Sequence, residues 1–474
     1  MRKKFLSLLL ALALTFALAG PAFAAQNALA LPLVVVQGFN AVPLMQGDKQ
    51  AFLPTDPMTY VNALLRTLPA LAAGIPQFFL RRSIEPLSEA LIPLAQALFE
   101  PLRLDARQNP VGEALTARQY PGSMANYDDG ARGLAMGQGF AYAEAYGWDH
   151  VYVYTFDWRR DIYELAAGLD EVIQRAKKET GQSRVNISAL SMGAAVTCAY
   201  LSEYAAKNGF ADINNLVYLS PGWQGTSSVS ALLTGELTVD FDNLSGQLWA
   251  ALDGKVNWLL NPLFGFLKQL GAAYFFEALA APVSALYLRG VIKYWPGIWA
   301  LCPYEDYDRA RAICFPGGGT KEEQALVKSL DKFHKAQGEQ AKVLRALQKT
   351  GRGFAVVSFY TAPMYAPIAR FQHTLWADGV IDTYFTGGFP GLARFPDGKL
   401  AAQAIADGHN HLSPDGAVDA SACLFPENTW FVRGPYHADY VPGEWPSRLA
   451  LWLLEGGSRG TVFSNEAYPQ FTVK

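Results

Sequence analysis

Six short runs of apolar residues recur along this chain of 474 residues, and stretches with a helical pattern separate most of them. Such runs, rich in β-branched and aromatic residues, are typical of strands that are buried on both faces of a parallel sheet. Alternation of these strands with helices favours an α/β fold. We therefore expect a mostly parallel central sheet covered by helices. The runs are residues 33–38, 151–156, 185–190, 216–220, 353–360 and 429–432.

Two long segments interrupt this alternation. Residues 43–126 are apolar and punctuated by proline, without strand periodicity or a repeat, so they are predicted to form a helical insertion. Residues 228–348 also have a helical pattern, and 256–267 within them are dense in large apolar and aromatic side chains. Interrupting Lys, Asn, Pro and Gly residues argue against a membrane-spanning helix there. We expect a helical cap or lid, which could cover an apolar pocket or contact a lipid surface.

We interpret the junction at residues 184–204 as the stretch that the rest of the chain serves. The apolar run reaches Ser191 and passes at once into a helical pattern, which predicts a strand, a sharp turn and a helix. Such a turn requires small residues two positions before and two after its centre, and Ala189 and Gly193 meet that requirement. The serine oxygen would lie at a helix N-terminus, where free N–H groups favour a developing negative charge. Ser191 is therefore predicted to be a nucleophile; an ordinary turn with a solvent-facing serine is the alternative.

Two backbone N–H groups are candidates for stabilising an oxyanion. The first apolar run continues to Gly38, and the carboxyl ends of parallel strands gather at one edge of a sheet. The N–H of Phe39 could then join the N–H of Met192, the residue after the serine. A core strand that simply ends in glycine explains the same residues.

A serine hydroxyl needs an imidazole within hydrogen-bond distance, itself oriented by a carboxylate. Among the six histidines, His437 follows the last apolar run by a few residues and is predicted to be the base. His409 and His411 are competitors, but they precede the expected acid in the chain. The remaining histidines, His150, His334 and His373, are expected at the surface.

The acid is expected in the polar segment ahead of the final strand. Asp415 lies in a turn-forming Pro-Asp-Gly sequence and is the preferred candidate. Asp419 and Asp378 are the alternatives, and Asp378 also precedes Gly-Val but lies farther from the final strand. Ser191, Asp415 and His437 would then form a triad in the chain order Ser, acid, His.

Charge and composition narrow the classes of partner. A net charge of −3 offers no attraction for nucleic acid. Hydrophobic residues make up 51% of the chain and charged residues only 17%, which favours contact with lipid or an apolar substrate. No spacing of Cys and His residues indicates a zinc site, so neither a metal nor a cofactor is predicted.

The N-terminus has the pattern of a secretory signal. Basic residues are followed by a short apolar run and by small residues at Ala22 and Ala24, which predicts a cleaved signal peptide over 1–24. Residues 25–474 would then form a secreted or extracytoplasmic protein. In an oxidising compartment Cys302 and Cys314 could close a small loop, whereas Cys198 is expected to be a buried thiol.

The chain resembles the lecithin:cholesterol acyltransferase and lysosomal phospholipase A2 family of α/β-hydrolases. Phe156-Asp157-Trp158-Arg159 is similar to the family's Tyr-Asp-Trp-Arg, and residues 220–236 resemble the segment that leads into its cap. Asp415-Gly416-Ala417-Val418 is similar to its Asp-Gly-Thr-Val acid turn. The resemblance covers the core strands and is thin across both insertions. From the residues themselves, the Asp157-Trp158-Arg159 corner is interpreted as a buried ion pair that holds a strand end.

This resemblance implies an α/β-hydrolase fold with helical cap insertions and a lipase, phospholipase or acyltransferase activity. We expect a secreted serine hydrolase that cleaves acyl groups from lipid esters, or transfers them to an alcohol, through an acyl-enzyme. The expected partners are the acyl-ester substrate and a lipid surface contacted by the cap. A non-lipid carboxylesterase on the same fold and a non-catalytic lipid- or surface-binding protein are the alternatives.

Overall fold

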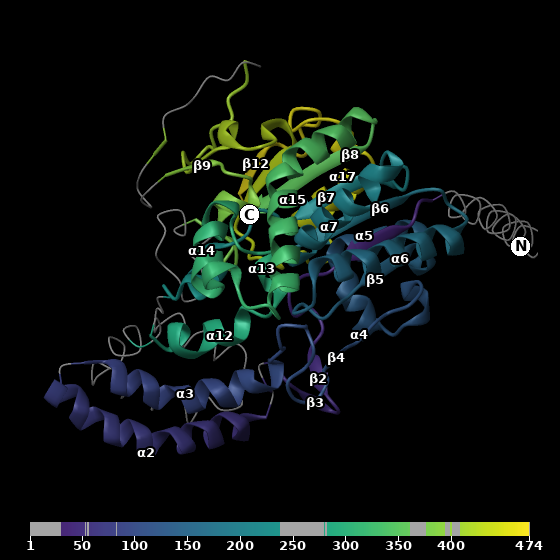
Figure 1. Ribbon diagram of the computed structural model, residues 1–474. Coiled ribbons are helices and arrows are strands. Elements are labelled where there is room, and N and C mark those ends of the chain that lie inside the picture. The colour runs from purple at the N-terminus through teal and green to yellow at the C-terminus, as the bar shows by residue number, and fades with distance from the viewer. Residues whose placement is uncertain are drawn as a thin grey trace, which may run out of the picture.

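Seven strands form a central sheet in which every neighbouring pair runs parallel (Figure 1). The computed structural model describes residues 30–52, 54, 56–81, 83–237, 279, 282–360, 376–393, 399–400 and 408–473. The sheet order is β12-β11-β8-β7-β6-β1-β5. The prediction of a mostly parallel α/β sheet is confirmed. The strands of the central sheet are β1 (Leu33–Val36), β5 (Val151–Tyr154), β6 (Val185–Leu190), β7 (Ile213–Leu219), β8 (Gly353–Phe359), β11 (Thr429–Arg433) and β12 (Phe471–Val473).

Helices cover both faces of this sheet (Figure 1). Alternate residues of β1 enter different cores, because successive side chains of a strand point to opposite faces. Leu33 and Val35 pack in the cluster that contains α5 (Met136–Tyr146) and α17 (Trp445–Leu454). Val34 and Val36 pack in the cluster on the other face. That second cluster contains α6 (Ile162–Thr180), α7 (Met192–Glu203) and α15 (Gln324–Lys349).

The first insertion contains both helices and strands. Its two long helices, α2 (Pro57–Arg81) and α3 (Glu85–Phe99), form a hairpin that projects from the rest of the chain (Figure 1). A small sheet of three strands, β2 (Leu44–Gln46), β3 (Lys49–Gln50) and β4 (Thr116–Ala117), lies at its base. The prediction of an all-helical insertion over 43–126 is therefore wrong in part, because strands of two or three residues are too short to produce a period of two.

The second insertion is helical where it is described. After α8 (Ser227–Thr234), residues 238–278, which include the aromatic-rich run 256–267, lie outside the described residues. Beyond these residues the chain forms a π-helical turn (Ser284–Leu288), α12 (Arg289–Ile292), α13 (Pro296–Trp299) and α14 (Tyr307–Cys314). Helix α15, which falls within the segment predicted as a helical cap, packs against α7 and β8 and so belongs to the layer that covers the sheet. The remaining short elements are α4 (Asp129–Arg132), α16 (Thr383–Thr386), β9 (Gly391–Leu392) and β10 (Val418–Asp419).

No helix in the described parts of the chain is long and apolar enough to cross a membrane. The predicted signal peptide, residues 1–24, lies outside the described residues. Cys302 and Cys314 are buried free thiols, so the small loop that they could close is not bridged in this structure. Cys198 is buried, as predicted, and burial raises the pKa of its thiol.

The start of α15 is tied to the second insertion by Glu323. Its carboxylate lies 2.7 Å from Lys293 Nζ, accepts a hydrogen bond from Tyr294 Oη at 2.7 Å and accepts one from the Thr320 N–H at 2.9 Å. Burial by itself would raise the pKa of Glu323, but these three donors outweigh it and hold the pKa at about 2.

We expect Glu323 to stabilise the fold above about pH 4.5 and to lose this contribution as the pH falls toward 2, because the carboxylate must then take up a proton. The difference between a pKa of 4.5 in the unfolded chain and about 2 in the folded one corresponds to a contribution of about 3 kcal/mol to the free energy of unfolding at neutral pH. Denaturant unfolding at pH 7 and pH 3 should show Glu323→Gln destabilised at pH 7 and less sensitive to acid. Glu322→Gln, at the exposed neighbouring position, is the matched control. Equal losses in both variants would contradict the prediction.

Candidate active site

Ser191 occupies the sharp turn that joins β6 to α7. Its backbone lies at φ 54° and ψ −125°, a strained conformation for a residue with a side chain. Gly193 makes this turn possible, since a Cβ there would lie 2.5 Å from the Val36 carbonyl oxygen and 2.7 Å from that of Gln37. Ala189 is fully buried in β6. The predicted strand, turn and helix are therefore present, with small residues where they were required.

The loop after β1 packs directly against this serine. A Cβ on Gly38 would lie 2.8 Å from Ser191 Cβ and 3.3 Å from its Oγ, so only glycine allows this close approach. Phe39 follows in the same loop, with its ring 4.5 Å from that of Trp158. Met192 is the first residue of α7, where N–H groups lack intrahelical acceptors. Phe39 and Met192, the two residues predicted for an oxyanion hole, thus directly follow Gly38 and Ser191, which pack against each other.

His437 is held by a carboxylate, but that carboxylate is Asp378. The Nδ1 atom of His437 lies 2.7 Å from Asp378 Oδ2, and the His437 N–H donates to the Asp378 carbonyl at 2.9 Å. The other carboxylate oxygen of Asp378 accepts hydrogen bonds from the Val380 and Ile381 N–H groups at 2.9 and 2.7 Å. Asp378 is fully buried and the His437 side chain nearly so. These bonds fix the orientation of the Asp378 carboxylate. They engage Nδ1 of His437, so Nε2 is the ring nitrogen that does not face Asp378.

The prediction that Asp415 holds His437 is wrong. Its carboxylate accepts hydrogen bonds from the Ser413 hydroxyl, the Ala417 N–H and the Arg433 guanidinium. Asp415 therefore closes its own turn and forms an ion pair with the end of β11. Asp419 accepts from the Ser421 N–H and hydroxyl, so it also serves a local turn. Asp378, the more distant alternative, is the carboxylate bonded to His437.

The segments that carry Ser191 and His437 meet at the end of β7. The Ser191 N–H donates to the Leu219 carbonyl at 3.1 Å, and the Ser191 carbonyl accepts from the Gly222 N–H at 2.8 Å. Ser220 lies between Leu219 and Gly222 in the chain. Its hydroxyl is 3.3 Å from that of Tyr440, which follows His437 closely in the chain. Burial raises the pKa of Tyr440, so its phenol stays neutral. These contacts bring both segments to the carboxyl edge of the same sheet.

The other histidines lie apart from this group. The prediction that His150 lies at the surface is wrong, because His150 is buried. His334 is half-buried and stacks on the rings of Tyr304 and Tyr307 at 4.2 and 4.1 Å. His411 is buried and bonded to Gln470 at 2.7 Å. His409 stacks on the ring of Phe463 at 3.9 Å. His373 lies outside the described residues.

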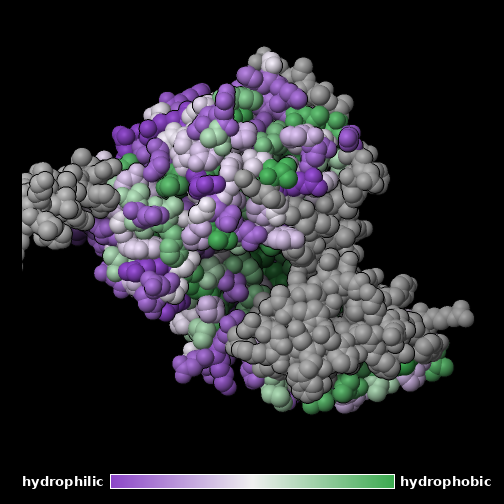
Figure 2. Space-filling view, turned by 180° about the vertical axis from the view of Figure 1, so that it is seen from behind, coloured by the Kyte–Doolittle hydropathy of each residue, from purple (hydrophilic) through white to green (hydrophobic). Residues whose placement is uncertain are grey.

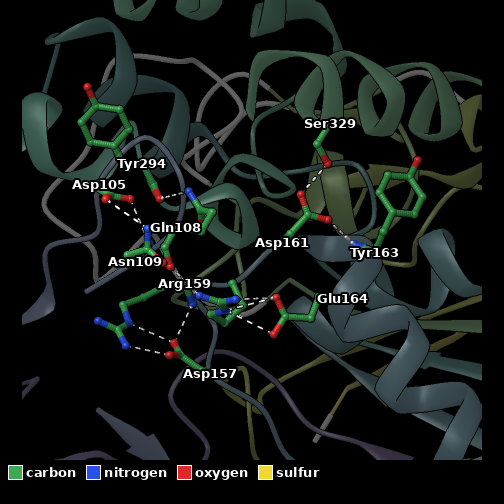
Figure 3. A network of polar contacts seen from close by, with 11 residues as sticks. Asp105, Gln108, Asn109, Asp157, Arg159, Asp161, Tyr163, Glu164, Tyr294 and Ser329 are labelled. Carbon is green, nitrogen blue, oxygen red and sulfur yellow. Dashed lines mark hydrogen bonds and ion pairs between the residues drawn. The ribbon is translucent and has the colours of Figure 1, made fainter. Parts of the chain in front are cut away.

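The Asp157-Trp158-Arg159 corner forms the buried ion pair that the sequence indicated (Figure 3). The guanidinium of Arg159, which is 2% exposed, donates to Asp157 at 3.0 and 2.7 Å and to the Leu102 carbonyl at 3.0 Å. Nearby, Gln108 donates to the Tyr294 carbonyl at 2.9 Å. The end of β5 is thus joined to the first insertion, which in turn is bonded to the second, so the corner has a structural role.

In the described parts of the chain, neither a metal-binding cluster nor the cavity beside β5 adds to this site. Among the described residues, no group of three or more His, Cys, Asp or Glu side chains is arranged to hold a metal ion. A cavity of about 540 Å³ lies between β5 and α6, lined by residues such as Tyr120, Arg160 and Glu171, and Ser191 is not part of its wall.

Comparison with protein-family models and with curated protein sequences finds no match for this chain.

Proposed function

We propose that the chain is a serine ester hydrolase of the α/β-hydrolase fold, with Ser191 as nucleophile, His437 as base and Asp378 as acid. The observation that carries the proposal is the Asp378–His437 pair at the same sheet edge as the strained Ser191 turn. The chain order Ser191, Asp378, His437 is also the order that this fold uses.

In the proposed reaction, His437 Nε2 takes the proton of the Ser191 hydroxyl as its oxygen attacks an acyl carbonyl. Asp378 holds the imidazole in the tautomer with its proton on Nδ1 and stabilises the imidazolium that forms. The N–H groups of Phe39 and Met192 stabilise the oxyanion, and His437 then protonates the leaving alcohol. Water hydrolyses the resulting acyl-enzyme.

Lipid esters are the substrates that the surroundings favour. Ser191 is only 6% exposed. The loop that packs against it carries Phe39, whose ring lies on that of Trp158, and the Leu301 side chain lies against Gly222, which is bonded to the Ser191 carbonyl. An acyl chain is compatible with these apolar groups, whereas a charged acyl group would lose its hydration there. The signal-like N-terminus further favours action outside the cytoplasm.

We expect a fluorophosphonate probe to modify the full-length protein at Ser191 alone, as mapped by mass spectrometry of its peptides. Turnover of long-chain acylglycerols, phospholipids and short-chain soluble esters should then be compared, with a preference for the long-chain substrates. A preference for short soluble esters would indicate a non-lipid carboxylesterase. Absence of labelling together with absence of turnover would contradict the proposed function.

A further inference from the structure

Asp382, four residues after Asp378 in the chain, has a fully buried side chain. Charged side chains usually lie at the surface, and hydrophilic residues cover much of the body of the molecule in Figure 2. A carboxylate withdrawn from water is stable only when hydrogen-bond donors replace its hydration. These donors come from the start of α8: the Ser227 N–H at 2.9 Å, the Ser227 hydroxyl at 2.8 Å and the Thr226 hydroxyl at 3.3 Å. The Asp382 carboxylate is therefore fixed to the first turn of α8.

The donors belong to a segment that also supports Ser191. This segment, residues 220–227, leaves the end of β7 and enters α8. Near its start, the Gly222 N–H donates to the Ser191 carbonyl at 2.8 Å. In its middle, the Trp223 indole N–H donates to the Phe385 carbonyl at 3.1 Å, close in the chain to the buried carboxylate. The segment is thus bonded to the Ser191 turn at one end and to the residues around the carboxylate at the other.

The backbone next to Asp382 closes the turn that carries Asp378. The Asp378 N–H donates to the Ile381 carbonyl at 3.2 Å, and Ala377 and Asp382 form an antiparallel bridge across the turn. The same turn contacts His437 twice, because the Asp378 side chain lies against its ring and the Asp378 carbonyl accepts its N–H. A displacement of Asp382 would therefore be passed to Asp378 and to the imidazole.

We propose that Asp382 is a positioning residue, whose carboxylate fixes the turn of Asp378 to residues 220–227. Because the turn holds His437 and the segment supports Ser191, this contact sets how the imidazole faces the hydroxyl. The inference rests on the proposed function, in which the imidazole takes the proton of that hydroxyl. Asp382 acts through the turn and is separate from the three groups of the triad. Its effect is expected to be large, since misplacing reacting groups by about 1 Å can lower a rate by about 10²-fold.

Asp382→Asn tests the contact with little change in shape. The amide offers one acceptor oxygen where the carboxylate offers two, and its NH₂ group would face donors of α8. We expect kcat for the preferred ester to fall by about tenfold to hundredfold with KM within about twofold, because proton transfer is misaligned while substrate binding is kept.

Ser227→Ala is a second and milder test, because it leaves the carboxylate and the Ser227 N–H in place. It should lower kcat by a smaller factor, and the double variant should lose little more than Asp382→Asn alone, since both changes break one contact. If Asp382→Asn fails to fold, Ser227→Ala takes its place in every comparison.

A proton resonance provides a readout that needs no turnover. The imidazole proton between His437 Nδ1 and Asp378 should give a resolved low-field signal in the proton NMR spectrum, assigned by its loss in His437→Gln. We expect this signal in wild type and its loss or upfield displacement in Asp382→Asn. If Asp382 served the fold alone, its replacement would lower the unfolding temperature and leave the signal in place.

Asp161→Asn is the matched control. Asp161 likewise caps a helix, because it accepts the Tyr163 N–H at 2.9 Å and the Ser329 hydroxyl, but it lies at the start of α6 (Figure 3). The variant should lose stability as Asp382→Asn does, while the low-field signal is retained and kcat stays within about twofold of wild type.

The outcomes separate this inference from the proposed function. Absence of both turnover and probe labelling in wild type would contradict the proposed function, and the low-field signal would still test the contact. Retention of the signal in Asp382→Asn would overturn the inference, as would unchanged kcat in an active enzyme. Absence of the signal from wild type, or its equal loss in Asp161→Asn, would also overturn it.

Discussion

Replacement of Ser191 by alanine should lower ester turnover by about 10⁴-fold or more while leaving the fold intact. In the proposed mechanism the hydroxyl oxygen forms the acyl-enzyme, and loss of the nucleophile of a triad removes nearly all catalysis by that triad. The methyl group of alanine fits where Ser191 Cβ already lies. Steady-state turnover of the preferred ester, with thermal unfolding measured in parallel, checks this expectation.

The strained backbone at Ser191 provides the accompanying control. At φ 54°, a residue without a Cβ carries no steric penalty, so Ser191→Gly should be more stable than Ser191→Ala by about 1 kcal/mol. Both variants should be equally inactive. Turnover by either variant close to that of wild type would exclude Ser191 as nucleophile, and equal stability would show that the turn stores little strain.

Asp378→Asn should lower kcat by about 10⁴-fold, the effect known for the equivalent change in serine proteases. The amide can still accept from the Val380 and Ile381 N–H groups, so the turn is retained. The amide nitrogen, however, would face His437 Nδ1, which must then accept a hydrogen bond. The imidazole proton would move to Nε2, and the ring could no longer take the proton of Ser191. Kinetics of the purified variant with the preferred ester measure the loss.

Asp415→Asn is the matched control for this prediction. Asp415 is an aspartate in a turn with comparable backbone contacts, and its charge partner is Arg433 instead of a histidine. We expect kcat within about threefold of wild type and a loss of stability of about 1 kcal/mol from the weakened ion pair. A large loss of kcat in Asp415→Asn, with Asp378→Asn near normal, would reverse the assignment of the acid.

The difference between these two aspartates shows where sequence reasoning is limited. Asp-Gly followed by a small apolar residue occurs at both Asp378 and Asp415, and each forms a turn in which its carboxylate accepts backbone N–H groups. The local pattern therefore cannot tell them apart. Proximity along the chain favoured Asp415, whereas the strand order places the turn after β8 beside the segment after β11. Both aspartates lie between β8 and β11 in the chain, and Asp378 is the nearer of the two to the end of β8.

The sequence by itself determined the elements whose causes are local. The apolar runs specify strands buried on both faces, and the small residues around Ser191 specify a sharp turn, because these requirements act on neighbours in the chain. The identity of the carboxylate bonded to His437, the burial of His150 and the contact of Asp382 with α8 were decided only by the tertiary structure. Each depends on which distant residues the chain brings together, and that follows from the packing of the whole sheet and its insertions.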